Sequence, residues 1–150
     1  MRYIKQAAVM LIVKNGLILA VSRRHNPNMF GLPGGKKENN ETIKNAAIRE
    51  CREETGIIVK DCIQFFERTE PPITPDGLSF YTYCFYALDW EGTPKNSEEG
   101  VVEWMFASEL TTTLDEGGKG AFADYNKRTL EAFSKIYPDV IVFSTKNLTK

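Results

Sequence analysis

Hydrophobic residues near the start of the chain form two runs on either side of an Asn-Gly pair. The runs are IKQAAVMLIV at 4–13 and LILAVS at 17–22, with Asn15 and Gly16 between them. Asn-Gly readily supplies the positive φ values of a two-residue type I′ turn, so the pattern predicts a β-hairpin. From Ala7 to Val13 and from Leu17 to Val21 the runs are apolar without alternation, which indicates a sheet covered on both faces.

The segment that follows mixes basic, polar and turn residues. Residues 23–33 therefore predict a loop that leads to Gly34 and Gly35. A helix is expected from about Thr42 to Thr55, with Thr42 as an acceptable N-cap. Gly56 is expected to follow the helix in the left-handed conformation.

The rest of the chain has three strand-like stretches, a second helical pattern and a possible short last strand. A Pro-rich loop with Asp76-Gly77 separates the first two strands, and Pro138 is expected to end the helix. The expected strands are 57–59 continued by 62–70, then 78–88, 101–106 and a short last one at 139–144. The expected helix is 121–137, and its apolar stripe consists of Phe122, Tyr125, Phe133, Ile136 and Tyr137. This order predicts an α/β protein with a mixed sheet between helices.

Length and composition indicate one soluble domain. The chain has 150 residues, so residues 1–150 are expected to form a single domain. Its 42% apolar and 26% charged residues are typical of globular proteins. The apolar run Ala7–Val13 is too short to span a bilayer and no cleavage site follows it, which favours a cytoplasmic protein without membrane contact.

The net charge and the cysteine content limit the kinds of partner and of compartment that are expected for this chain. The net charge is −1 and the pI is about 5.9, so no basic footprint favours a nucleic-acid polymer or an anionic membrane. A small anionic substrate would need a local patch or a bound cation. The three cysteines have no CxxC spacing, which suits a reducing cytosol and argues against a disulfide framework.

Three carboxylates fall on one face of the predicted helix. Glu50, Glu53 and Glu54 lie within about 100° of one another at helical spacing, and no cationic residue lies on that face. Clustered oxygen ligands suit Mg²⁺ or Mn²⁺, which also recruits substrate phosphates, and a spare carboxylate can deprotonate a water. The alternative is a solvated surface helix, as runs of Glu usually are. The carboxylate face alone leaves both interpretations open.

The residues around that face resemble a known family. Residues 35–57 are similar to the Nudix box, G-x5-E-x7-R-E-U-x-E-E-x-G-U, in which U is apolar. Nine constrained positions match at the required spacing: Gly35, Glu41, Arg49, Glu50, Cys51, Glu53, Glu54, Gly56 and Ile57. The resemblance implies a Nudix α/β/α sandwich over nearly the whole chain. It also implies Mg²⁺-dependent hydrolysis of a nucleoside diphosphate linked to a further group.

The same resemblance implies roles for individual residues. Glu50, Glu53 and Glu54 correspond to metal ligands, one of which also orients or deprotonates water, and Gly35 to a backbone-carbonyl ligand. Arg49, one helical turn from Glu53, corresponds to the arginine that fixes a catalytic carboxylate. Glu41 is expected to help structure the loop. The choice of base among the glutamates stays open.

Later segments resemble the MutT type, whose members hydrolyse damaged nucleoside triphosphates to monophosphate and pyrophosphate. The segment DWEGTPKNSEEGVVEWM is similar to the MutT strand-loop-strand, and it places Glu99 where a further metal-binding or catalytic Glu lies. Glu98 is the neighbouring alternative. The alternative is that Glu99 is a solvated loop carboxylate.

The resemblance also suggests substrate contacts. FADYN at 122–126 aligns with the purine-reading segment, where Phe122 can stack on a base and Asp124 and Asn126 can bind its edge. Alternatively, Phe122 belongs to the core and Asp124 only caps the helix. Arg23 and Arg24 lie where basic residues meet phosphates, and one of the two is expected to do so.

Two other functions remain open at this stage. Pro71 and Pro72 lie where enzymes that hydrolyse ADP-ribose or nucleotide sugars often have a proline, although a turn explains them as well. A non-catalytic domain that binds nucleotide is the other alternative, but such domains tend to lose box residues. The expected partner is in each case a small nucleotide, and the chain is expected to be a monomer or a homodimer.

Overall fold

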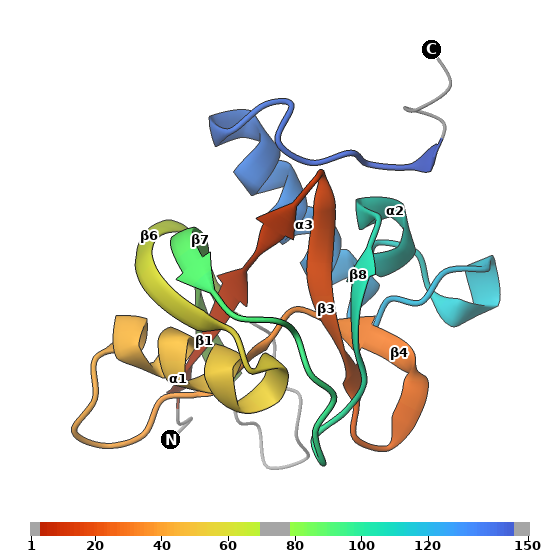
Figure 1. The fold of residues 1–150 in the computed structure, drawn as a ribbon. Helices are drawn as coiled ribbons and strands as arrows, with labels where there is room; N and C mark the ends of the chain where they lie inside the picture. The colour runs from red at the N-terminus through yellow and green to blue at the C-terminus, as the bar shows by residue number, and fades with distance from the viewer. Residues whose placement is uncertain (1–3, 70–78, 146–150) are drawn as a thin grey trace.

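Two β-sheets and three helices make up the computed structural model, which describes residues 4–69 and 79–145 (Figure 1). The first sheet has the order β5-β1-β7-β6, in which β1 and β7 are parallel and the other neighbours antiparallel. Its strands are β1 (Ile4–Leu11), β5 (Gly34–Lys36), β6 (Ile58–Thr69) and β7 (Ser79–Glu91). This mixed sheet confirms the predicted α/β class.

The second sheet is built on β3 (Leu17–Arg23). Three antiparallel partners pair with this strand: β2 (Val13–Lys14), β4 (Asn26–Gly31) and β8 (Val102–Met105). The helices are α1 (Ile43–Thr55), the short α2 (Ala107–Leu110) and α3 (Ala123–Ile136), with a single 3₁₀ turn at Leu114–Glu116. Figure 1 shows α1 and α3 on opposite sides of the strands, as expected for a sandwich.

The predicted hairpin is present between β2 and β3. Asn15 and Gly16 have φ values of 53° and 81°, as a turn with two positive φ values requires. The first arm is divided, however, because the chain passes from the first sheet to the second at Ile12. Because the apolar run is uninterrupted, the sequence does not show where the chain passes from one sheet to the other.

Both faces of the central strands are covered, as their apolar pattern predicts. Met10 and Ile12 are buried in one core with Ala47 and Cys51 of α1. Leu11, which points the other way, is buried in a second core with Phe133 of α3. Because alternate residues of these strands enter two different cores, both sets are apolar and the sequence shows no alternation of polar and apolar residues.

The ends of α1 agree with the sequence. Thr42 is the N-cap, and its Oγ1 accepts a hydrogen bond of 3.1 Å from the Asn45 N–H. Gly56 is left-handed, with φ 81°, and its N–H donates to the Arg52 carbonyl at 2.9 Å. The carboxylate-bearing helix is therefore fixed at both ends by local sequence signals.

The loop predicted at 23–33 is wrong, because most of it is strand β4. As a strand it pairs with β3, with a register shift between Ser22 and Arg23, and within the described residues its other side carries only an isolated bridge from Phe30 to Gly120. An edge strand tolerates Pro27, whose missing N–H removes no central ladder bond. Gly34 and Gly35, at the end of the predicted loop, also belong to a strand, β5.

The last predicted strand, 139–144, is also wrong. This segment makes isolated backbone bonds, from Val142 N–H to the Gly16 carbonyl and from Ser108 N–H to the Phe143 carbonyl, and no ladder. The helix at 121–137 is confirmed as α3, but two residues of its predicted stripe, Phe122 and Ile136, are 54% and 53% exposed. The positions that α3 buries are Ala123, Asn126, Thr129, Leu130 and Phe133.

Two further expectations were incomplete. Within the described residues, the stretches predicted at 57–59 and 62–70 belong to one strand, β6 (Ile58–Thr69), whose pairing with β7 has three register shifts. The helix α2 was not predicted, since four residues are too few to show a helical period. The Pro-rich loop with Pro71, Pro72 and Asp76-Gly77 lies outside the described residues.

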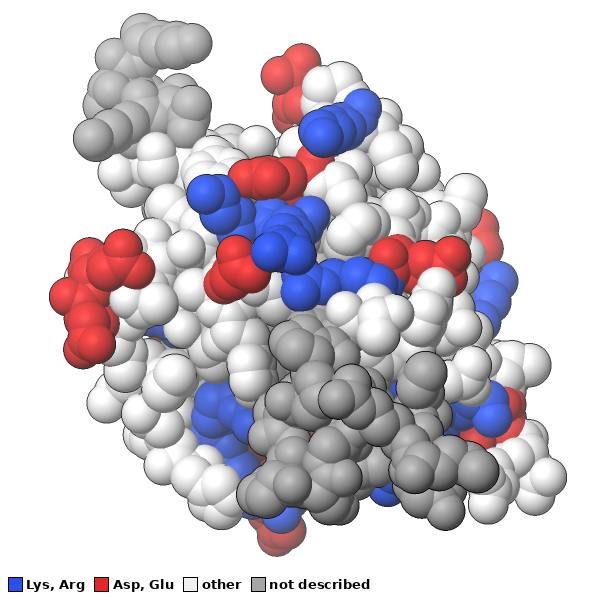
Figure 2. Space-filling model, turned by 180° about the vertical axis from the view of Figure 1, so that it is seen from behind, with Lys and Arg blue, Asp and Glu red and all other residues white. Residues whose placement is uncertain are grey.

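On the face that Figure 2 shows, positive and negative side chains are interspersed. Lysine and arginine side chains lie there beside Asp and Glu side chains. None of the helices that the structure describes is long and apolar enough to cross a membrane.

Candidate active site

Helix α1 lies beside the short edge strand β5, and two contacts align them. The Gly34 N–H donates to Glu54 Oε1 at 2.7 Å. A Cβ added at Gly35 would lie 2.5–2.7 Å from the carboxylate atoms of Glu50, so any other residue here would have to displace that carboxylate. The two glycines thus bring backbone groups of β5 directly against two carboxylates of α1.

Arg49 forms a third contact with this strand and links the carboxylates to one another. Its Nη2 donates to the Lys36 carbonyl at 3.1 Å, and its Nη1 donates to Glu50 at 3.0 Å and to Glu53 at 3.2 Å. The predicted contact with Glu53 is therefore present. The expectation that no cation offsets the glutamate face is wrong, because the long side chain of Arg49 reaches that face from beside it.

Glu41 holds Arg49 from the opposite side. The guanidinium donates to both of its oxygens, from Nη2 at 2.8 Å and from Nε at 3.1 Å, and the Glu38 N–H donates to Oε1 at 2.8 Å. The hydrogen bonds from Arg49 and then from Glu38 lower the pKa of Glu41 to about 2. These contacts confirm the expectation that Glu41 structures the loop before α1.

Two of the carboxylates on α1, Glu50 and Glu54, have raised pKa values. Burial, followed by the charges of Glu50, Glu99 and Glu53, raises the pKa of Glu54 to about 8, although the Gly34 N–H opposes this rise. Burial also raises the pKa of Glu50, against the effect of Arg49. Raised pKa values of neighbouring carboxylates indicate a site that favours added positive charge.

These residues fit a hard divalent cation. The donors are carboxylate oxygens, and the glycine at position 35 leaves the Glu50 carboxylate uncovered by any Cβ. Within residues 4–69 and 79–145, no three His, Cys, Asp or Glu side chains already converge on one ion position. Mg²⁺ commonly uses only one or two carboxylates together with waters and substrate phosphates, so the donor set is sufficient.

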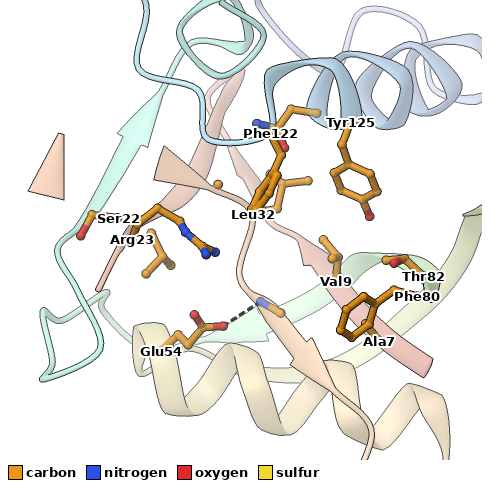
Figure 3. Close-up of a pocket in the computed structure, with 14 residues that line it drawn as sticks. Ala7, Val9, Ser22, Arg23, Leu32, Glu54, Phe80, Thr82, Phe122 and Tyr125 are labelled. Carbon is orange, nitrogen blue, oxygen red and sulfur yellow. Dashed lines mark hydrogen bonds between the residues drawn. The ribbon is translucent and has the colours of Figure 1, made fainter. Parts of the chain in front are cut away.

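A pocket of about 210 Å³ opens beside Glu54 (Figure 3). It contains three of the predicted substrate residues, Arg23, Phe122 and Asn126, which come from β3 and from α3 and its N-cap. The rest of its wall is mainly apolar: Ala7, Val9, Val21, Gly31, Leu32, Gly34, Phe80, Thr82, Tyr125 and Ser22. The fold thus joins segments from both halves of the chain to the carboxylates of α1.

Phe122 and Arg23 contact each other across this pocket. The Arg23 guanidinium carbon lies 4.9 Å from the centre of the Phe122 ring, within the range of a cation–π contact. Phe122 has φ 55° and ψ 50°, a left-handed conformation that is unusual for a bulky residue. Its ring is more than half exposed, so the alternative that it belongs to the core is wrong.

Asn126 is buried at the base of the pocket with its orientation fixed. Its Nδ2 donates to the carbonyls of Leu110 and Ala121, both at 2.8 Å, and the side chain is only 2% exposed. Both donor hydrogens are therefore used within the protein. Asn126 offers a ligand the acceptor Oδ1, and not the donor and acceptor that its sequence position suggested.

Arg24 and Asp124 do not join the pocket. Arg24 is exposed and is not part of the pocket wall. Asp124 is exposed in the first turn of α3 and forms its ion pair with Arg128 one turn later. Of the two predicted arginines the structure brings only Arg23 to the pocket, and of Asp124 and Asn126 it brings only Asn126.

Glu99 lies on a loop that is tied to β3. Ser22 Oγ accepts a hydrogen bond of 2.9 Å from the Val101 N–H, and the Ser22 N–H donates to the Val101 carbonyl at 2.9 Å. The charge of Glu99 raises the pKa of both Glu50 and Glu54. The structure therefore brings Glu99 near the box carboxylates.

Sequence reasoning missed the contacts made by Gly34 and Ser22. Gly34 precedes the box, so the motif gives it no weight, although its place in a Gly-Gly pair signals a close backbone approach. Ser22 is a polar residue at the end of an apolar strand, and it is buried. A buried hydroxyl needs a partner, and that requirement is the signal that identifies it.

Three comparisons with known proteins bear on this site. The NUDIX domain family model matches residues 4–125. The 8-oxo-dGTP diphosphatase of Escherichia coli is 35% identical over 105 residues, which cover 67% of this chain and 78% of that protein. The MutT NUDIX hydrolase from Burkholderia pseudomallei has a similar structure, with a TM-score of 0.68 and 23% identity over 87% of this chain and 98% of its own.

A shorter match involves another activity. The ADP-ribose pyrophosphatase of Methanocaldococcus jannaschii is 46% identical over 52 residues. These residues cover 33% of this chain and only 31% of that relative.

Proposed function

Because this chain belongs to the Nudix hydrolase family, we propose that it cleaves a phosphoanhydride of a nucleoside triphosphate, intact or oxidised, into nucleoside monophosphate and pyrophosphate. The observation that carries this proposal is the position of Glu54. Its carboxylate forms part of the wall of the pocket that also contains Arg23, Phe122 and Asn126. A nucleoside held in that pocket would present its phosphates to the carboxylates of α1.

The box residues have defined parts in this proposal. Glu50, Glu53, Glu54 and Glu99, with the Gly35 carbonyl, would hold Mg²⁺ or Mn²⁺, which when bound neutralises phosphate charge and makes a water more acidic. The Gly34 N–H fixes the direction of the Glu54 carboxylate. Arg49 keeps Glu50 and Glu53 in place from its anchor on Glu41. One of the glutamates takes the proton of the attacking water.

The pocket residues would select the nucleotide. Phe122 presents an exposed ring on which a base can stack, and Arg23, which already contacts that ring, lies between it and Glu54 in the view of Figure 3. Asn126 Oδ1 would accept a hydrogen bond from an N–H on the base edge. Thr82 and Phe80 of β7 close the wall beside the nucleoside.

Hydrolysis of ADP-ribose is the second candidate. It is supported by the local identity to an ADP-ribose pyrophosphatase, which is confined to 52 residues. The greater coverage of the 8-oxo-dGTP diphosphatase, 78% against 31% of the relative, favours the triphosphate. A purely nucleotide-binding role is disfavoured because all nine constrained box positions are kept.

A substrate panel tests the proposal. The purified protein is incubated with Mg²⁺ and with normal and oxidised nucleoside triphosphates, ADP-ribose, nucleotide sugars and dinucleoside polyphosphates, and the products are separated and identified. We expect a triphosphate to be hydrolysed fastest, with pyrophosphate released. Faster turnover of ADP-ribose would favour the second candidate, and nucleotide binding without turnover of any compound would exclude hydrolysis.

A further inference from the structure

Ser22 is a buried polar residue to which the proposed reaction assigns no part. It lies near the end of β3, is only 6% exposed and forms part of the pocket wall beside Arg23. In Figure 3 its hydroxyl points away from Glu54, on the side of the ribbon that leads into β8. The polar atom of Ser22 therefore faces the segment before β8 and not the proposed position of a nucleotide.

Two hydrogen bonds join Ser22 to Val101. The Val101 N–H donates to Ser22 Oγ, and the Ser22 N–H donates to the Val101 carbonyl, both at 2.9 Å. A Cβ added at Gly100 would lie 2.7 Å from the Ser22 carbonyl oxygen and 2.8 Å from Ser22 Oγ. Any other residue at position 100 would have to move this segment away from β3. We call the contacts of Ser22 with Gly100 and Val101 the Ser22 junction.

Glu99 directly precedes this junction, in a turn that is closed by its own hydrogen bonds. The Ser97 N–H donates to the Gly100 carbonyl at 3.0 Å, and the Gly100 N–H donates to the Ser97 carbonyl at 3.2 Å. The Glu99 N–H donates to Ser97 Oγ at 3.1 Å, and the Val102 N–H donates to Asn96 Oδ1 at 2.9 Å. Because the turn is braced internally, its contact with β3 determines where Glu99 lies.

From these contacts we propose that Ser22 is a positioning residue, which holds Glu99 beside the carboxylates of α1. This rests on the proposed function, in which Glu99 belongs to the group of residues that act on the phosphates. The Ser22 hydroxyl is committed to Val101, so Ser22 acts on the reaction through the turn at 97–100. Its effect on turnover therefore depends on the Glu99 carboxylate.

Three roles for Ser22 predict different kinetics. A purely structural role would lower the free energy of unfolding and leave the kcat of the folded enzyme unchanged. A direct contact with the bound nucleotide would raise KM when the hydroxyl is removed. A positioning role lowers kcat and keeps KM, because the substrate still binds while a group needed in the transition state is displaced.

A double-mutant cycle tests the dependence on Glu99. Ser22→Ala should lower kcat about tenfold and change KM less than about twofold, since the turn loses one of its anchors. Ser22→Thr keeps a hydroxyl and should restore most of the rate. In the Glu99→Gln background, Ser22→Ala should lower kcat by less than a further factor of about two, because residues that act together are not additive. A full tenfold loss in that background, or a rise in KM with normal kcat, would overturn the proposal.

Gly100→Ala breaks the Ser22 junction from its other side. Its Cβ would push the turn away from β3, so kcat should fall at least as far as in Ser22→Ala, and again only slightly in the Glu99→Gln background. Ser134→Ala, on α3 and outside the pocket wall, is the matched control and should keep normal kcat and KM. Normal kcat in both Ser22→Ala and Gly100→Ala would refute a positioning role.

Amide NMR in EDTA adds a measurement that does not depend on turnover. Ser22→Ala should shift the amide signals of Ser97, Glu99 and Val101 and speed the hydrogen exchange of the Val101 N–H, whereas Ser22→Thr should keep the values of the unmodified protein. Unchanged signals and exchange in Ser22→Ala would rule out the Ser22 junction as the anchor of Glu99. If the unmodified protein turned over no substrate while these shifts were present, only the proposed function would be contradicted.

Discussion

Glu41 and Arg49 are joined by two parallel hydrogen bonds, of 2.8 Å and 3.1 Å, that connect the loop after β5 to the middle of α1. The remaining Nη1 donor of Arg49 is thereby directed at Glu50 and Glu53. A lysine has one ammonium group and cannot make both sets of contacts. The geometry of the carboxylates therefore depends on a guanidinium at this position.

Arg49→Lys should lower kcat about 10²-fold, because misplaced carboxylates lose the reactive geometry while the charge is kept. Steady-state kinetics with the best substrate of the panel measures the effect. Arg52→Lys is the matched control, since Arg52 is exposed on the same helix, and it should retain normal kcat. A similar loss of kcat in both variants would mean that the effect comes from a general change in α1 and not from the loss of the contact with Glu41.

The pKa of Glu54 predicts how stability depends on pH in the absence of metal. Its pKa rises from 4.5 to about 8 on folding, so the folded state binds the proton more tightly than the unfolded state. This contribution to stability is complete below pH 4.5 and is lost as the pH rises through about 8. Urea unfolding in EDTA should show a decline over this range that is smaller in Glu54→Gln. Parallel curves for the two proteins would contradict the assignment.

Arg23 and Arg24 form a natural pair of variants. Arg23 lines the nucleotide pocket and contacts Phe122, whereas Arg24 is exposed outside it. Arg23→Ala should raise KM about tenfold through the loss of a phosphate contact, and Arg24→Ala should leave KM unchanged. If Arg24→Ala had the larger effect on KM, the phosphates would have to follow a different path.

Asn126→Ala should affect both stability and selectivity. Removal of the amide leaves the Leu110 and Ala121 carbonyls without their donor, which should reduce the free energy of unfolding by about 2 kcal/mol. The order of preference among bases should also change, because the acceptor Oδ1 is lost. Asp124→Ala, two residues away and exposed, should change neither. An unaltered nucleotide profile at a temperature where Asn126→Ala is folded would remove Asn126 from base reading.

The parts of the fold that the sequence predicts are those with local causes. Thr42, Gly56 and the Asn15-Gly16 turn each act through their own backbone geometry, so their positions were predictable. The strand at 26–31 was not predictable, because an edge strand tolerates the Pro and Asn residues that usually indicate a loop. The division of the first arm at Ile12 depends on the parallel pairing of β1 with β7, which is distant in sequence.

The candidate site also has a part that local sequence predicts and a part that it does not. Glu50, Glu53 and Glu54 share a face because of helical spacing, and that face is readable from the sequence. The meeting of Arg23 with Phe122 joins β3 to the start of α3 across nearly a hundred residues, and no local pattern encodes it. The donors of Asn126 are likewise used by carbonyls whose positions only tertiary structure determines.

The most direct test of the central claim is the turnover of Glu53→Gln and Glu54→Gln with Mg²⁺ and the best triphosphate. Each substitution keeps the shape of the side chain and removes its charge, so folding should be intact by circular dichroism. We expect kcat to fall about 10²–10⁴-fold in each variant, with pyrophosphate release reduced in parallel. Near-normal rates in both variants would contradict the assignment of the reaction to the carboxylates of α1.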